Sequence, residues 1–234
     1  MEQVTKHPVL AADSLTLYSA ILYTFCFCDE TSVSGQQRVD WKSIKIAGQK
    51  IIGETVYDLG HLQDAKYAFT IEATQKYPEV SFEVLVQYSS HCVSWGPKHG
   101  QIIDFSIHGE DRRIIDDKGI HRCFCEDRYG FSHALPDIFC TLPERHCLFT
   151  GRENWLTVDI GDRFGYSQEY EVYFNITRQS GRLLRIYVES AYVRTEGIAI
   201  QKPLHLKRRD RVRGKVLLAK KVRGEPVRRP IRKR

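Results

Sequence analysis

The sequence predicts an α+β domain: a mainly antiparallel sheet, arranged as a meander, with one or more packed helices. Residues 80–88 alternate between apolar and polar side chains, the period-two pattern of a strand that buries one face. Residues 128–142 place apolar side chains so that they can share one face of a helix. Two more alternating runs, at 170–177 and 183–193, flank a short loop with glycine. A strand, a helix and then an antiparallel meander indicate the α+β class.

The first 76 residues show the weakest pattern. Trp41, Ile44 and Ile51 suit a helical stripe, but three glycines argue against a long helix: Gly48, Gly53 and Gly60. We therefore expect three parts: an N-terminal α or mixed subdomain at 1–76, an α+β core domain at 77–200, and a basic C-terminal arm at 201–234.

The core domain is expected to open with two strands. The apolar face of the first consists of Val80, Phe82, Val84, Val86 and Tyr88. The second is predicted at Gln101–His108, where Ile103, Phe105 and Ile107 alternate with polar residues, and a charged loop at Gly109–Lys118 comes after it.

A helix or broken helix is predicted at Arg128–Leu142. Pro136 fits only a first turn or a kink, and Ser132 as N-cap would put the proline near the start of the helix. A strand is expected at Cys147–Ile160, broken by Gly151.

The segments Tyr170–Thr177 and Leu183–Val193 should pair as an antiparallel hairpin. Pairing their apolar faces places polar side chains on one shared surface: Tyr173, Asn175, Arg185, Tyr187 and Glu189. A surface with cationic, carboxylate and phenolic groups suits phosphodiester binding and proton transfer. An ordinary solvated sheet face, with cross-strand charge pairs, has the same pattern.

Charge is distributed unevenly along the chain. Residues 205–234 carry fourteen Lys and Arg against two acids, a net +12, whereas the whole chain is +6. Such asymmetry points to nucleic acid, an anionic membrane surface or an acidic partner. The cations expected to contact nucleic acid, with RNA favoured, are Lys207, Arg208, Arg209, Arg211, Arg213, Lys215, Lys220, Lys221 and Arg223. The arm has no aromatic residues to stack on bases, which favours contact with the phosphate backbone.

Length and cysteine content suggest the compartment. A chain of 234 residues with 42% hydrophobic residues can bury one substantial core, and its seven cysteines are an odd number that a disulfide framework would not use up. A reducing cytoplasm is the simplest setting. The longest apolar stretch, Leu15–Cys28, contains polar residues and is shorter than the ~20 residues that span a bilayer, so no transmembrane segment is predicted.

Four short motifs between Glu79 and Val193 carry a family resemblance. They are Tyr88–Cys92, Arg128–Ser132 with Leu135 and Pro136, Tyr170–Phe174, and Val188–Tyr192. In these motifs the chain resembles a group of small uncharacterised bacterial proteins. More remotely, it resembles the metal-independent ribonuclease toxins of the barnase, EndoU, colicin and RelE superfamily, which cleave RNA on a curved sheet.

The resemblance implies catalytic roles for His91, Arg128, Ser190 and Tyr192, with Arg185 and Glu189 added by the polar face of the hairpin. Each also has a structural interpretation. His91 would bond a backbone carbonyl, and Arg128 would pair with Glu126 or Asp127 on a solvated turn. Ser190 and Tyr192 continue the parity of the buried Leu184, Ile186 and Val188, so they would be core or rim residues.

Metal chemistry is the rival hypothesis, and the sequence argues against it. The pairs Cys26–Cys28 and Cys123–Cys125 have one intervening residue, whereas structural zinc sites prefer pairs two to four apart. Apolar neighbours fit buried thiols better. Phosphate-binding glycine loops and zinc-protease or serine-hydrolase motifs are absent from the sequence, so neither metal nor cofactor is expected.

Two functions remain. The first is a metal-independent RNA-cleaving, toxin-like protein with a nucleic-acid-docking tail, whose partners would include a protein inhibitor or antitoxin. The second is a non-enzymatic nucleic-acid-binding or protein-interaction adaptor associated with a bacterial mobile element. An enzyme requires His91, Arg128, Ser190 and Tyr192 to converge on one cleft, and an adaptor does not.

Overall fold

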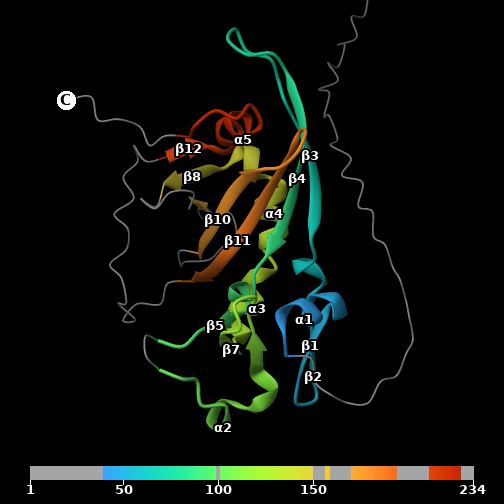
Figure 1. Ribbon diagram of the computed structural model, residues 1–234, viewed down its shortest axis with the longest axis vertical. Helices are drawn as coiled ribbons and strands as arrows, with labels where there is room; N and C mark the ends of the chain where they lie inside the picture. Colours follow the sequence, from blue (N-terminus) through green and yellow to red (C-terminus); the bar gives the residue numbers. More distant parts are fainter. Residues whose placement is uncertain (1–38, 99–100, 150–155, 159–169, 194–210, 228–234) are drawn as a thin grey trace, which may run out of the picture. The chain divides into compact units, whose positions relative to one another are not determined.

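The computed structural model describes residues 39–98, 101–149, 156–158, 170–193 and 211–227, and these residues form an α+β fold (Figure 1). Its largest element is a seven-stranded sheet with the order β12-β8-β9-β10-β11-β4-β3. The strands are β3 (Ala65–Ile71), β4 (Val80–Tyr88), β8 (His146–Phe149), β9 (Leu156–Val158), β10 (Tyr170–Arg178), β11 (Leu183–Val193) and β12 (Arg211–Arg213). Every pairing in this sheet is antiparallel except that of β11 with β4.

Two smaller sheets and several helices complete the described part. The strands are β1 (Gln49–Ile52) paired with β2 (Thr55–Asp58), and β5 (Ser94–Trp95), β7 (His121–Phe124) and β6 (Arg113–Ile115) in that order. The α-helices are α1 (Trp41–Ala47), α2 (Phe105–His108), α3 (Glu126–Ser132), α4 (Leu135–Cys140) and α5 (Gly214–Val222). The 3-10 turns are η1 (Gly60–Leu62), η2 (Ser90–Cys92), η3 (Glu110–Arg112) and η4 (Leu142–Glu144).

The core lies between one face of the large sheet and helices α4 and α5. Phe139 of α4 packs edge-on against Phe174 of β10 at a centroid distance of 5.4 Å. Leu217 and Leu218 of α5 are fully buried in the same cluster. The predicted strand at 80–88 is confirmed as β4, with Phe82, Val84, Val86 and Tyr88 buried.

The predicted hairpin is confirmed as β10 and β11, but its register contains a bulge. Phe174 pairs with Val188 and the preceding Tyr173 pairs with Ser190, so Glu189 is the extra residue. Because of the bulge, the side chains of β11 after Val188 switch faces: odd-numbered residues now face the core and even-numbered residues face away from it. Ala191 is therefore buried, and the expectation that Ser190 and Tyr192 continue the buried face is wrong.

The helical segment is broken, as expected, into α3 and α4. Pro136 lies in the first turn of α4, where it removes no helical hydrogen bond. The prediction of Ser132 as N-cap is wrong: Ser132 ends α3, and its Oγ donates to the carbonyl of Tyr129.

The strand expected at Gln101–His108 is also wrong. Asp104 caps the short helix α2 by accepting the N–H of Ser106, and the chain leaves the helix at Gly109, where φ is +96°. Ile103 and Phe105 are buried while Ile107 is exposed. A short apolar run fits both elements, and here the cap determines the outcome.

Residues 39–76 share one core with the later part of the chain. Strand β3 pairs along its length with β4, and the indole N–H of Trp41 donates to the carbonyl of Tyr88 at 3.0 Å. Trp41, Ile44 and Leu62 belong to the main core cluster. No helix in the described residues is both long and apolar enough to cross a membrane.

The C-terminal basic segment is part of the fold between residues 211 and 227. Strand β12 is an edge strand against β8, and α5 comes directly after it. A Cβ at Gly214, where the two meet, would lie 1.8 Å from the carbonyl oxygen of Leu142. Deletion of residues 205–234 would therefore take away an edge strand and core side chains, and we expect it to destabilise the fold.

Candidate functional site

Most of the predicted catalytic residues lie where β4 and β11 end. The two strands are parallel neighbours, so their carboxyl ends lie at the same edge of the sheet. Turn η2, which carries His91, comes after β4 there. The hydroxyl of Ser89 accepts the N–H of His91 at 3.2 Å and donates to the carbonyl of Glu189 at 2.6 Å. We call this region, with His91, Arg128, Glu189, Ser190 and Tyr192, the His91 end.

His91 pairs with a carboxylate that the sequence analysis missed. Its Nε2 lies 3.3 Å from Oδ2 of Asp116, whose other oxygen accepts the N–H groups of Lys118 and Ile120. Burial, with smaller effects from Arg122 and Arg128, lowers the pKa of His91 to about 4. The ring is therefore neutral at pH 7. The sequence Asp-Asp-Lys-Gly at 116–119 is a turn signal, but it does not indicate that the turn meets η2.

Arg128 holds the backbone beside His91. Its Nη1 donates to the carbonyls of His91 and Ser94 at 2.9 and 2.7 Å, and its guanidinium lies 5.2 Å from the ring centroid of Tyr192. The expected pairing with Glu126 is not what the structure shows, because Glu126 pairs with Arg112. Burial lowers the pKa of Arg128. Arg128 thus joins the backbone at His91 to the ring of Tyr192.

Ser190 and Tyr192 lie on the polar face of the hairpin because of the bulge. The rings of Tyr192 and Tyr173 stack at 5.8 Å, and their hydroxyls are 3.5 Å apart. Both tyrosines are half-buried. The hydroxyl of Tyr173 also donates to Oε2 of Glu171, so the stacked pair is held to a carboxylate on the same face.

Glu189 and Arg185 belong to a hydrogen-bonded network across this face. Glu189 accepts from the amide of Asn175 at 3.2 Å, and Arg185 donates to Gln87 at 2.5 Å. Burial raises the pKa of Glu189, opposed by Lys118, Asn175 and Arg185. Lys118, like Asp116, is a residue of this site that the sequence analysis missed, since only the tertiary fold brings its loop to the sheet.

The predicted nucleic-acid-binding residues that the structure describes lie on β12 and on or directly after α5, away from the His91 end. Lys207, Arg208 and Arg209 lie outside the described residues. Arg211 and Arg213 of β12 and Lys215 of α5 are exposed, and the other predicted contacts are half-buried at the end of α5: Lys220, Lys221 and Arg223.

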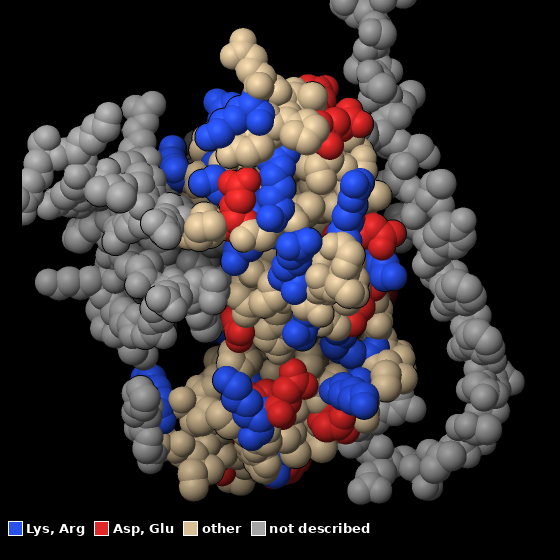
Figure 2. All heavy atoms as spheres, turned by 45° about the horizontal axis from the view of Figure 1, so that its top comes forward, with Lys and Arg blue, Asp and Glu red and all other residues tan. Residues whose placement is uncertain are grey.

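Three segments distant in sequence converge at the end of α5. Arg223 donates to the carbonyl of Pro78 at 3.1 Å, and its guanidinium lies 4.4 Å from the ring centroid of Tyr77. A Cβ at Gly224 would lie 2.9 Å from Nη1 of Arg178, so the end of β10 reaches the same place. We call this region, with Lys76, Arg178, Arg182, Lys220, Lys221 and Arg223, the basic end. Figure 2 turns it toward the viewer and shows Lys and Arg side chains spread over this face, with Asp and Glu interspersed.

A metal site is not found among the described residues, which contain no group of three or more His, Cys, Asp or Glu that could hold an ion. Cys123 is buried on β7 and Cys125 is half-buried, and both are free thiols. Cys26 and Cys28 lie outside the described residues.

Comparison with known proteins places most of the chain in one family. The model of the YjaZ family matches residues 49–222, which include β1 to α5 and both ends of the large sheet. The match agrees with the expectation of an uncharacterised bacterial family and leaves the resemblance to ribonuclease toxins untested. No curated protein and no solved structure matches the chain.

Proposed function

The chain belongs to the YjaZ family, and we propose that this member binds RNA through its folded basic C-terminal segment. The observation that carries the proposal is the position of the cations. Helix α5 is fixed by Leu217, Leu218 and Val222 in the core, so its lysines project from an element whose backbone is already ordered before binding.

Within the part of the chain that the structure describes, the cations of the basic end lack acidic partners. None of them forms an ion pair there, whereas Arg112, Arg113 and Arg145 elsewhere each pair with a carboxylate. A cation whose charge is not neutralised by a carboxylate remains available to attract a phosphate. Binding by such groups is non-specific in sequence and steeply dependent on salt.

The test measures this salt dependence. Lys215→Gln with Lys220→Gln removes two charges from α5, and Lys42→Gln with Lys98→Gln removes two exposed charges elsewhere. Fluorescence anisotropy with a labelled RNA should show that the α5 variant binds more weakly. Its plot of log affinity against log salt should flatten by about 0.7 for each phosphate of a single strand that the protein no longer neutralises. Equal salt slopes for the two variants would show that α5 is not part of the RNA-binding surface.

A second candidate, metal-independent RNA cleavage, is supported by the His91 end. Burial raises the pKa of Glu189, although Lys118 and Arg185 lie nearby and oppose this effect. The hydroxyl of Ser89 bonds to the backbone of both Glu189 and His91 and so links the two residues. In this hypothesis His91, whose ring is neutral at pH 7, accepts the proton of the ribose 2′-hydroxyl, and the carboxyl group of Glu189 gives a proton to the leaving 5′-oxygen. The cations would stabilise the phosphorane charge. A toxin-like enzyme of this kind would have a protein inhibitor or antitoxin as its partner.

The cleavage hypothesis has its own experiment. Purified protein in excess EDTA should cut diverse RNAs, and Glu189→Gln should lose about 10²- to 10⁴-fold of the rate while still binding RNA. If the RNA stays intact although the protein binds it, the cleavage hypothesis is refuted and only the proposed RNA binding remains. The matched control is Glu79→Gln, which changes an exposed carboxylate distant from the His91 end.

A further inference from the structure

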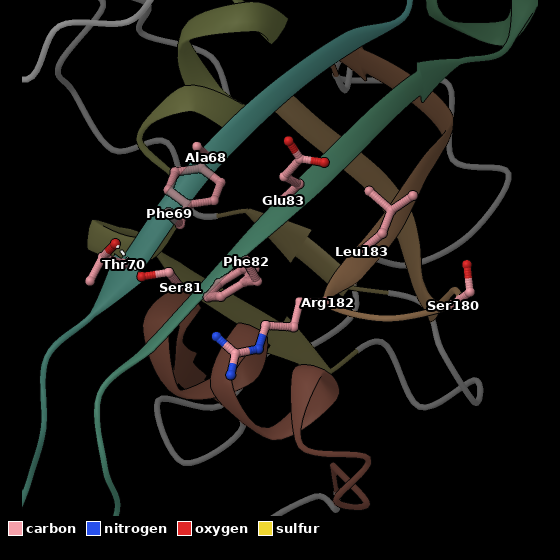
Figure 3. A pocket seen from close by; sticks show the side chains of 9 residues that line it. All are labelled: Ala68, Phe69, Thr70, Ser81, Phe82, Glu83, Ser180, Arg182 and Leu183. Carbon is pink, nitrogen blue, oxygen red and sulfur yellow. Dashed lines mark hydrogen bonds between the residues drawn. The ribbon is translucent and has the colours of Figure 1, made fainter.

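A recess of about 460 Å³ opens at the basic end between the edge of the large sheet and the turn after β10. Figure 3 shows its lining side chains coming from β3, β4 and that turn. The polar ones are Thr70, Ser81, Glu83, Ser180 and Arg182. The hydroxyls of Thr70 and Ser81 lie 2.9 Å apart.

The recess has a cationic and an anionic side. Arg182 is exposed and forms no ion pair within the described residues, so its guanidinium can receive a phosphate. Glu83 contributes a carboxylate, which accepts hydrogen bonds and repels anions. A ligand that fits both carries an anionic group together with hydroxyl or amine donors. A free phosphate satisfies Arg182 alone.

The recess is continuous with the cations of α5. Arg178 ends β10 and Arg182 lies in the turn that follows it, and Arg178 reaches Gly224 just beyond α5. The N–H of Glu83 donates to the carbonyl of Arg182 at 3.0 Å, which fixes the turn against β4. An RNA strand whose backbone runs past Lys220, Lys221 and Arg178 therefore arrives at the recess.

We propose that this recess takes one nucleotide of single-stranded RNA, with its phosphate on Arg182 and its ribose or base donors on Glu83 and the hydroxyls of Thr70 and Ser81. The inference rests on the proposed RNA binding and adds the strandedness of the ligand. In a duplex the bases are stacked and paired, so none is free to enter a recess, whereas an unpaired nucleotide can leave the stack. The ribose 2′-hydroxyl, which DNA lacks, is a donor for the Glu83 side.

The experiment compares Arg182→Gln with Lys42→Gln, which removes an exposed charge outside the basic end. The probes are a labelled 12-nucleotide oligouridylate, its duplex with oligoadenylate, and the DNA strand of equal length. Arg182→Gln should weaken binding of the single-stranded RNA about 10-fold, the size of a lost charge-assisted hydrogen bond, and binding of the duplex less than about twofold. Lys42→Gln should change neither. Equal losses on the single-stranded RNA and the duplex, or no difference between the variants, would overturn the proposal.

A second measurement locates the nucleotide. Photocrosslinking of oligouridylate containing 4-thiouridine, followed by mass spectrometry, should label peptides with residues 68–70, 81–83 or 180–183. Crosslinks restricted to other peptides would contradict the inference even if Arg182→Gln weakens binding.

The outcomes also separate this inference from the function on which it rests. A wild-type protein that binds none of the three probes refutes both. A wild-type protein that binds single strand and duplex alike, with a salt slope that depends on Lys215 and Lys220, retains the proposed function and refutes the role of the recess.

Discussion

The two ends of the large sheet differ in how their charged groups are satisfied. At the His91 end, charges are bonded within the protein: His91 to Asp116, Glu189 to Asn175, and Arg128 to two backbone carbonyls. At the basic end, cations project from α5 and the turn after β10 without a carboxylate partner in the described residues. A polar surface with internal partners stabilises the fold, and one without them is open to a ligand. The basic end is therefore the better candidate for a binding surface, because its cations have no carboxylate partner among the described residues.

The largest expected effect tests whether the basic end is part of the core. Leu217→Asp places a carboxylate where the side chain is 0% exposed, and Val216→Asp places one at a site that is 41% exposed. The first should lower the free energy of unfolding by about 3–5 kcal/mol, and the second by less than about 0.5 kcal/mol. Urea denaturation measures both. Similar midpoints would show that α5 is not packed in solution.

The next effect tests the structural role of Arg128. Arg128→Met removes the donor of two partly buried hydrogen bonds to backbone carbonyls and should cost on the order of 2–3 kcal/mol. Arg112→Met removes only a solvated ion pair with Glu126 and should cost about 0–1 kcal/mol. If the two variants unfold at the same urea concentration, Arg128 is not a structural brace and its catalytic interpretation gains weight.

A smaller effect concerns two glycines. Gly214→Ala forces a Cβ into the carbonyl of Leu142 and should destabilise the protein by about 1–3 kcal/mol. Gly130→Ala, in α3, meets nothing within 4 Å and should stabilise it by about 0.5–1 kcal/mol. Thermal denaturation followed by circular dichroism gives both signs. A neutral Gly214→Ala would mean that β12 and α5 shift freely against η4.

The smallest effect is the pH dependence contributed by His91. Its pKa is about 4 in the folded protein and ordinarily about 6.5, so the unfolded chain binds the proton more readily. Its stabilising contribution is complete above pH 6.5 and is lost as the pH falls toward 4. Between pH 7 and 5 the wild type should lose about 1–2 kcal/mol more than His91→Gln. His121→Gln, at an exposed residue, is the control and should behave like the wild type.

The predicted parts of the fold were those with a regular local pattern. Alternation indicated β4 and the β10–β11 hairpin because a strand places successive side chains on opposite faces whatever its neighbours are. The strand prediction at 101–108 was wrong because an apolar run of this length fits a short capped helix as well as a strand. The basic composition of residues 205–234 did not indicate that α5 would be packed in the core.

By itself, the sequence determined the α+β class, strand β4, the β10–β11 hairpin and the cationic character of the C-terminal segment, because each is encoded in periodicity or composition. Only the tertiary structure decided which ends of strands meet. The parallel pairing of β11 with β4 brings His91 to Glu189, the bulge turns Ser190 and Tyr192 to the polar face, and the packing of α5 brings Arg223 to Tyr77. These contacts join residues far apart in the chain, so they depend on register and packing between elements, which no local pattern specifies.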